Sequence, residues 1–147
     1  MSKKKGFSLV EVLVFVTILS LFFVAAMAVT TYSLKNMKNQ EYKIIASHLA
    51  EEGMEWVKSE KEGDWTDFSS KDTGAGTTYC LKDLNWDSPD PCADYTLGTP
   101  AIFKREIEID NQAGSPVSSI DVQITVSWTE GTTIFQVPVK TVLNIWE

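Results

Sequence analysis

The chain begins with a long apolar stretch that carries almost no charge. Residues 7–29 contain one ionisable side chain, Glu11, and neither glycine nor proline. A helix of about 23 residues, rising about 1.5 Å per residue, crosses a hydrocarbon core of about 30 Å. We therefore predict a membrane-spanning helix over residues 7–30.

The pattern then becomes amphipathic, which predicts that the helix continues through residues 31–62. Charged side chains such as Glu52 should face solvent, while an apolar stripe should pack on the rest of the protein. That stripe consists of Tyr42, Ile45, Ala46, Leu49, Gly53, Trp56 and Val57. Lys61 and Gly63 suit a helix C-terminus, so we expect the helix to end near Glu62.

Residues 63–147 form the predicted globular head, in which three runs have the composition of strands. These runs are residues 102–110, 119–129 and 133–146. Apolar and polar residues alternate strictly from Ile120 to Thr129, which is typical of a sheet with one buried face. Gly131 lies in a tight connection that joins the last two runs as a hairpin, and Pro138 favours an edge position or a bulge for the final strand.

The buried face of this sheet should pack against the amphipathic half of the helix. We thus expect an α+β fold, in which one long N-terminal helix covers a small antiparallel sheet. Residues 64–100 are rich in Asp, Gly and Pro, so we expect an irregular stretch with one short strand near residues 77–81.

Both cysteines of the chain, Cys80 and Cys92, lie in this irregular stretch. Beyond a membrane anchor a disulfide between them is expected, and it would stabilise a small head by about 3 kcal/mol. Two free thiols are the alternative. Zinc is disfavoured because a structural site needs four clustered Cys or His ligands, and the single histidine, His48, lies in the helix.

Charge and motifs exclude several functions. The chain has 13 basic and 20 acidic residues, a formal net charge of −7, which disfavours direct nucleic-acid binding. No Gly-x-Ser-x-Gly or phosphate-loop motif is present, and residues 63–147 contain no histidine to act as a base. We predict neither enzymatic activity nor a cofactor.

The head offers two candidate ligand sites, and both have simpler explanations. Asp87, Asp90 and Asp94 could supply oxygen ligands to Ca²⁺, but their spacing differs from an EF-hand and Asp is a common turn residue. Trp65 and Trp86 could stack on a sugar, but core or loop-anchoring roles explain them as well. We therefore predict no metal site and a structural role for both tryptophans.

The acid within the apolar stretch needs an explanation of its own. A carboxylate in the membrane costs a few kcal/mol, so Glu11 indicates a function that involves a charged partner. Three lysines at positions 3–5 favour a cytoplasmic N-terminus, which places the residues after Val29 outside the cytoplasm. The alternative is an ordinary secretory signal cleaved after Ala28, although the apolar run is longer than such signals need.

The sequence Lys3–Gly6, followed by Phe7–Glu11 and the apolar run, resembles the N-terminus of type IV pilins and type II secretion pseudopilins. The resemblance implies that a prepilin peptidase cleaves after Gly6 and methylates Phe7, the new first residue. It also implies that Glu11 pairs with the terminal amine of a neighbouring subunit. Such a protein starts in the cytoplasmic membrane and ends in a pilus or pseudopilus.

Two further features favour a minor pilin or pseudopilin over an abundant shaft subunit. Residues 46–57 resemble the stalk-to-head segment of minor pilins, and residues 7–62 lack the proline that many major pilins carry in the apolar segment. We therefore predict a structural filament subunit. A signal-anchored or secreted binding protein outside the cytoplasm is the alternative.

Overall fold

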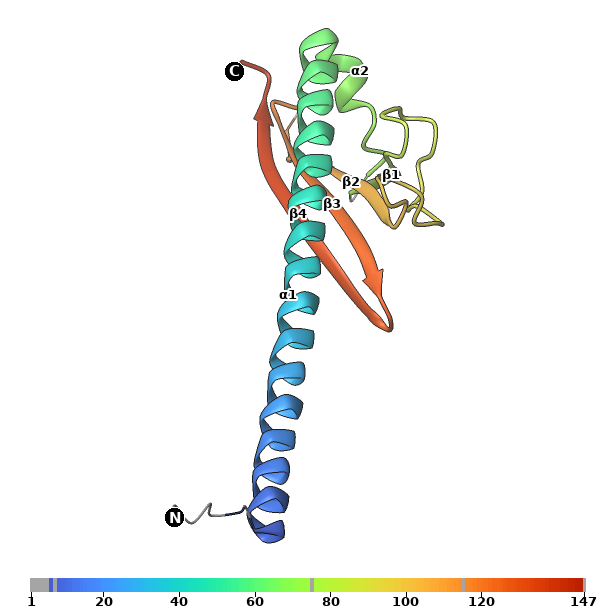
Figure 1. Cartoon of the computed structure of the whole chain (residues 1–147). Coiled ribbons are helices and arrows are strands. Elements are labelled where there is room, and N and C mark those ends of the chain that lie inside the picture. Colours follow the sequence, from blue (N-terminus) through green and yellow to red (C-terminus); the bar gives the residue numbers. More distant parts are fainter. Residues whose placement is uncertain (1–5, 7, 75, 115, 147) are drawn as a thin grey trace. The chain divides into compact units, whose positions relative to one another are not determined.

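The structure is a computed structural model that describes residues 6, 8–74, 76–114 and 116–146 (Figure 1). The chain divides into two compact units, Met1–Glu41 and Tyr42–Glu147. Helix α1, Leu9–Gly63, runs through the boundary between them. The predicted long helix is therefore confirmed and ends one residue later than expected, while its expected first residue, Phe7, lies outside the described residues.

A short second helix, α2, spans Trp65–Ser69. Asp64 caps it, because its Oδ1 accepts hydrogen bonds from the backbone N–H groups of Thr66 at 2.8 Å and Asp67 at 3.0 Å. An irregular stretch is predicted here, and that prediction is wrong for these five residues. The signal for the helix is an N-capping aspartate directly before two aromatic residues three positions apart.

Four antiparallel strands follow in the order β1-β2-β3-β4, so that each strand pairs with the next along the chain. Their bounds are Thr77–Cys80, Phe103–Asn111, Ser119–Glu130 and Thr133–Asn144. All four predicted strands are present, although the last ends two residues before Trp146. Gly131, with a φ of 62°, occupies the left-handed conformation in the two-residue turn between β3 and β4.

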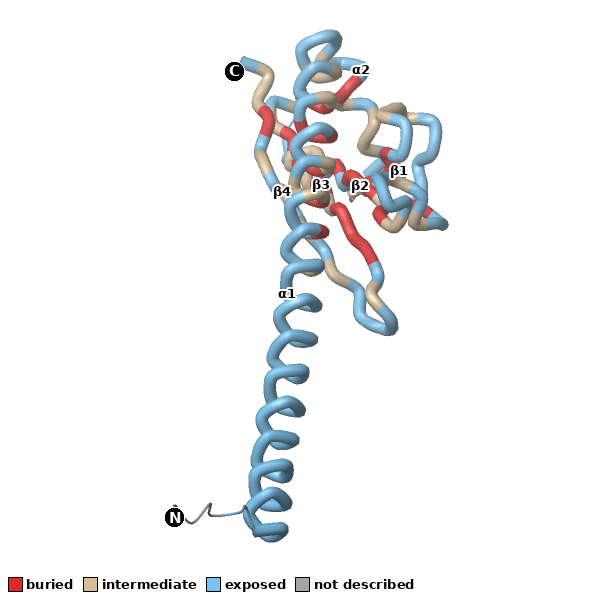
Figure 2. The backbone as a smooth tube through the Cα atoms, viewed as in Figure 1, coloured by how far each residue is buried: buried red, intermediate tan, exposed pale blue. Residues whose placement is uncertain are grey.

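The core of the second unit lies between the sheet and residues 42–63 of α1 (Figure 2). The alternating residues of β3 contribute side chains with no exposed surface: Ile120, Val122, Ile124, Val126 and Trp128. The facing side of α1 contributes Tyr42, Ala46, Ala50, Met54 and Val57. Burying a large apolar side chain stabilises the fold by about 1.5–3 kcal/mol, so this contact holds the helix on the sheet. The predicted α+β packing, a pilin-like fold, is confirmed.

β4 is an edge strand of the sheet, as Pro138 indicates, because proline cannot donate to a strand ladder. Its inward side chains Phe135, Val137 and Val139 pack against the core and are half-buried. Its outward side chains include Ile134, which is exposed. Proline on an exposed edge also discourages pairing with a further strand.

The segment between β1 and β2 is held on the sheet by covalent and polar contacts. Cys80 and Cys92 form the predicted disulfide. The backbone N–H of Leu81 donates to the carbonyl oxygen of Arg105 at 2.9 Å, and the N–H of Cys92 donates to Oε1 of Glu106 at 2.9 Å. A segment with little regular structure therefore has a fixed position beside β2.

Candidate functional site

The N-terminal half of α1 presents apolar side chains on all sides. Every described residue from Ser8 to Lys38 is exposed, and Figure 2 shows this part of the helix in the exposed colour throughout. By length and composition, α1 is the one helix in the described part of the chain that could cross a membrane. Leu9–Val29 alone measures about 31 Å, which matches a hydrocarbon core of about 30 Å.

The four hydroxyl groups within residues 17–31 are compatible with an apolar environment because each donates to a backbone carbonyl of its own helix. An unpaired hydroxyl costs about 1–3 kcal/mol when it is removed from water. Here the acceptors lie three or four residues earlier, a common arrangement for Ser and Thr in helices. The four bonds run from Thr17 to Val14 at 2.8 Å, Ser20 to Val16 at 2.7 Å, Thr30 to Ala26 at 2.9 Å and Thr31 to Met27 at 2.9 Å.

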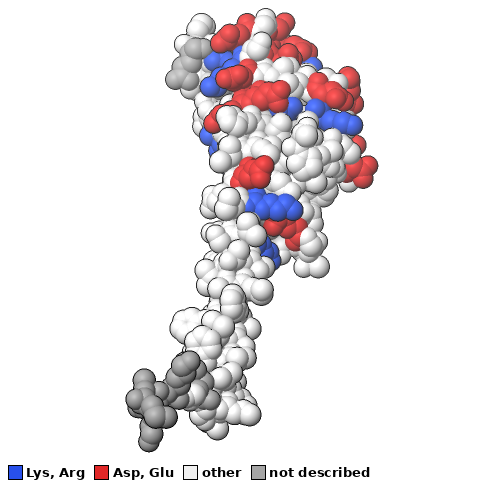
Figure 3. Space-filling model, viewed as in Figure 1, with Lys and Arg blue, Asp and Glu red and all other residues white. Residues whose placement is uncertain are grey.

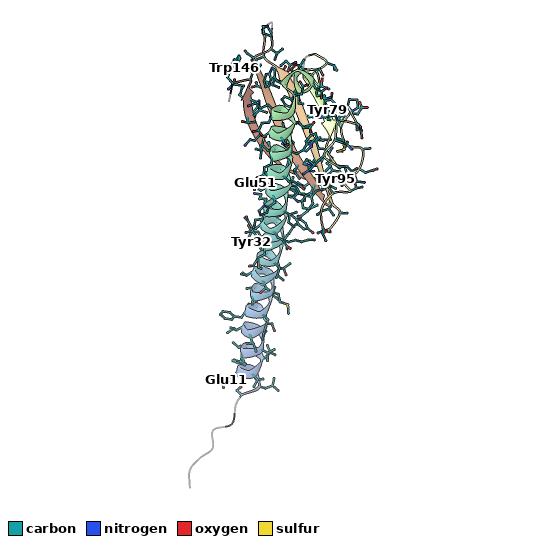
Figure 4. The ribbon with its side chains drawn as sticks, turned by 90° about the horizontal axis from the view of Figure 1, so that it is seen from above. Glu11, Tyr32, Glu51, Tyr79, Tyr95 and Trp146 are labelled. Carbon is teal, nitrogen blue, oxygen red and sulfur yellow. A yellow bond between two sulfur atoms is a disulfide. The ribbon has the colours of Figure 1, made fainter. Side chains whose placement is uncertain are left out.

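Glu11 is the charged residue of this stretch, and it lies in the first turn of α1 (Figure 4). The carbonyl oxygen of Ser8 accepts the first helical hydrogen bond, from the N–H of Val12 at 3.2 Å. A carboxylate in the first turn offsets the partial positive charge of the helix N-terminus, an effect of about 0.3–1 kcal/mol at an exposed position. Within the part of the chain that the structure describes, no cationic side chain pairs with Glu11.

The other predicted N-terminal residues are only partly described. Gly6 is exposed, and a Cβ added there would meet nothing within 4 Å. Phe7 and the lysines at positions 3–5 lie outside the described residues. The expected cleavage and methylation at Gly6 and Phe7 therefore remain predictions.

The candidate calcium ligands of the head are not brought together. Asp87, Asp90 and Asp94 are all exposed. Among the described residues, no group of three Asp, Glu, His or Cys side chains is placed to hold a metal ion.

The candidate sugar-binding tryptophans are engaged in packing. Trp86 lies 4.7 Å from Trp56 between ring centroids, and its Nε1 donates to Oε2 of Glu60 at 2.7 Å. Trp65 donates from Nε1 to the carbonyl oxygen of Val117 at 3.0 Å. Both side chains fix loops to the core, in agreement with the structural role predicted for them.

The sequence prediction missed a buried cation in the head. Arg105 of β2 is 1% exposed, and its Nη1 donates to Oε2 of Glu52 at 2.7 Å. Glu52 is therefore paired and not simply solvated, which corrects its predicted role. The signal was available in the strand pattern, because Arg105 alternates in phase with the buried residues Phe103 and Ile107.

Charged groups are distributed unevenly along the chain. On the face shown in Figure 3, the apolar half of α1 carries no visible charge, and acidic and basic residues gather on the second unit. In the part of the chain that the structure describes, no cluster of these side chains has the arrangement of a metal centre.

A long N-terminal helix packed on an antiparallel four-stranded sheet defines a pilin-like α+β protein. Residues 1–27 match the family model of the prokaryotic N-terminal methylation motif. The match covers residues 1–6 and most of the apolar stretch, and it includes Glu11. No match was found among curated proteins or solved structures. The chain therefore combines the methylation motif of pilins and pseudopilins with a pilin-like fold.

Proposed function

We propose that this protein is a minor pilin or pseudopilin, a structural subunit of a type IV pilus-like or type II secretion filament. The observation that carries the proposal is the position of Glu11, a single acid in the first turn of an exposed apolar helix. The methylation motif in the same residues supports it. In our proposal residues 1–6 are the leader, 7–30 the membrane helix, 31–62 the stalk and 63–147 the head.

The proposed assembly step begins with cleavage after Gly6 by a prepilin peptidase. Cleavage creates an α-amino group on Phe7, which the enzyme methylates and which stays positively charged. Two opposite charges about 4 Å apart attract by about 4 kcal/mol at an effective dielectric constant near 20. Glu11 of one subunit then pairs with the amine of a neighbour when the apolar helices pack together.

The value of this ion pair lies in the register it imposes on the subunits. Burying two charges costs desolvation, so a correct pair gains little over apolar packing. A subunit that docks in the wrong register leaves a carboxylate unpaired in an apolar environment, at a cost of roughly 3–5 kcal/mol. Glu11 therefore selects one register out of many that apolar side chains alone would allow.

The location follows from the same features. Before assembly the protein spans the cytoplasmic membrane once, with its head outside the cytoplasm. Its partners are the prepilin peptidase and other filament subunits. After assembly it lies in a filament at the cell surface or in the periplasm. Direct nucleic-acid binding forms no part of this role, given the net charge of −7.

Mass spectrometry of the mature N-terminus tests the processing step. We expect a chain that begins with N-methylated Phe7. The rival function, a secreted binding protein, requires cleavage after Ala28, and a mature chain that begins at Val29 would overturn our proposal.

Substitution of Glu11 tests the assembly step. Glu11→Ala should stay in the membrane fraction but enter filaments poorly, because the neighbouring amine loses its partner. Glu41→Ala is the matched control, since Glu41 is also an exposed acid on α1 but lies beyond the apolar stretch. If both variants enter filaments at the same rate, the register argument is wrong even where processing is correct.

A further inference from the structure

We propose that Tyr32, Lys35 and Lys38 form a binding surface for anionic phospholipid headgroups where α1 leaves the outer side of the membrane. This surface is called the exit surface below. The inference rests on the proposed membrane insertion of residues 7–30. It goes beyond filament assembly, because its partner is a lipid and it acts on the subunit before assembly.

The heights of Tyr32 and Lys35 along the helix fit the headgroup layer, and Lys38 lies nearly one turn further out. Tyr32 lies about 4.5 Å, Lys35 about 9 Å and Lys38 about 13.5 Å beyond Val29 at a rise of about 1.5 Å per residue. The polar layer extends roughly 5–8 Å outside the hydrocarbon core on each side. Helical side chains lean toward the helix N-terminus, which for α1 is toward the membrane. The side chain of Lys35 therefore leans back into the phosphate layer, and that of Lys38 leans toward the same layer from outside it.

The side chains of the exit surface are also of the types found at a membrane–water interface. Tyr32 is 75% exposed (Figure 4), and tyrosine is enriched at membrane interfaces because its ring is apolar and its hydroxyl polar. Lys35 and Lys38 are exposed as well. Residues 12–34 carry no charge, so these two lysines are the first charged groups after the apolar stretch. Their long aliphatic stems can lie along the apolar layer while the ammonium groups bind phosphate.

The expected size of the effect is measurable. A lysine close to an anionic membrane surface increases association about fivefold. The attraction falls off within a Debye length of about 10 Å at 0.1 M salt. Enrichment of anionic lipid around α1 should therefore decrease when the ionic strength is raised.

Energy transfer from the exit surface to lipid tests the proposal. The full chain carries two cysteines, both in the disulfide, so Ser33→Cys introduces a single free thiol for a fluorescent donor. The labelled chain is inserted into phosphatidylcholine vesicles that contain acceptor-labelled phosphatidylglycerol or acceptor-labelled phosphatidylcholine. The ratio of the two transfer efficiencies measures lipid preference near residue 33.

Three variants of the labelled chain give the decisive comparison. Lys35→Gln/Lys38→Gln removes the proposed cations, and Lys35→Arg/Lys38→Arg retains them. Lys43→Gln/Lys58→Gln removes the same charge from exposed positions further along α1. The lysines at positions 3–5 are unchanged in all of them, so their own attraction to lipid cancels in the comparison.

We expect a preference for phosphatidylglycerol that is lost in the Gln pair at 35 and 38 and kept in the Arg pair and in the control. Resistance to extraction by alkaline carbonate shows that a chain is inserted in the membrane. If the Gln pair at 35 and 38 is inserted and keeps the preference for phosphatidylglycerol, the exit surface is wrong and the proposed membrane insertion stands. Chemical cross-linking of the same chains tests for a protein partner instead. If the Gln pair at 35 and 38 reduces cross-linking between chains but keeps the lipid preference, the lysines serve a subunit contact, which also overturns the inference. If alkaline carbonate extracts the parent chain from the vesicles, the proposed membrane insertion itself is wrong.

Discussion

Gly53 of α1 lies directly against Arg105 of β2. A Cβ on Gly53 would come within 3.0 Å of Arg105 Cδ and 3.1 Å of Ile124 Cδ1. The missing side chain lets the helix approach the sheet closely enough for the arginine to reach across the interface. Arg105 then donates from Nε to the carbonyl oxygen of Leu81 at 3.0 Å and from Nη1 to that of Leu49 at 2.8 Å. One buried guanidinium thus connects α1, β2 and the disulfide-bonded loop.

Gly53→Ala should destabilise the head by about 1–2 kcal/mol. Overpacking a tight interface costs about 1–3 kcal/mol, and the better helix propensity of alanine returns up to about 1 kcal/mol. Arg105 cannot move aside easily because its head group makes several hydrogen bonds. Urea unfolding of the full chain in detergent micelles, followed by tryptophan fluorescence, measures the change.

Gly63→Ala is the control for this prediction, because a Cβ at Gly63 meets nothing within 4 Å. We expect its stability to stay within about 0.5 kcal/mol of the parent. Equal stability of the two alanine variants would show that the interface has room to relax around Gly53.

Glu52→Ala should cost about 1–3 kcal/mol of head stability, since it leaves the buried guanidinium of Arg105 without a charged partner. The carboxylate is 56% exposed, so water replaces part of the lost interaction and the cost should lie toward the lower end of this range. Glu55→Ala removes an exposed acid from the same helix and should change little. If the two variants unfold at the same urea concentration, the ion pair contributes nothing to stability.

The fold was predictable where one physical rule dominates. The strict alternation from Ile120 to Thr129 determines β3, because a sheet with one buried face requires it. The uncharged stretch after Glu11 determines the membrane-like part of α1. In both segments the local pattern agrees with the environment in the folded protein, so tertiary contacts do not alter the secondary structure that the pattern predicts.

The prediction failed where tertiary contacts override composition. An arginine considered alone is expected to be solvated. The burial of Arg105 is explained by its position in the alternating pattern of β2 and by the space that Gly53 leaves beside it. The loop after β1 is irregular, as predicted, but the sequence did not identify Glu60 of α1 as the partner of Trp86. The phase of β2 indicates that Arg105 is buried, but no periodic signal identifies partners so distant in sequence, which is why Glu52 and Glu60 were not predicted as partners.

Removal of the disulfide with Cys80→Ser/Cys92→Ser should lower the stability of the head by about 3 kcal/mol. Cross-linking residues twelve positions apart restricts the unfolded chain, and that restriction is lost in the variant. Reduction of the parent protein with dithiothreitol should cause the same change in urea midpoint. A variant as stable as the oxidised parent would show that hydrogen bonds to β2 alone hold the loop.

Asp72 should make the stability of the head sensitive to acid. Its pKa lies below the ordinary value of 3.8. Burial acts to raise this pKa, but hydrogen bonds from the N–H groups of Asn111 and Gly74 and from the hydroxyl of Thr77 outweigh it. These bonds tie the segment before β1 to the end of β2. The ionised carboxylate is therefore the form that the fold stabilises.

The sign of the effect follows from this lowered pKa. Because the folded protein holds the carboxylate ionised more strongly than the unfolded chain, the contribution of Asp72 is complete above about pH 4 and is lost as the pH falls further. Asp72→Asn should be about 1–3 kcal/mol less stable than the parent at neutral pH, since the Asn side chain has a single acceptor oxygen and cannot accept at both Oδ1 and Oδ2 as the carboxylate does. The difference should shrink as the pH falls below 4.

Urea unfolding at a series of pH values measures this difference, with the five tryptophans, all beyond residue 55, reporting on the head. Asp90→Asn is the matched control, because Asp90 is exposed and should give a small difference at every pH. A gap between Asp72→Asn and the parent that stays constant from pH 7 to pH 3 would mean that the side chain acts through shape alone. In that case the carboxylate charge would have no part in joining the segment before β1 to β2.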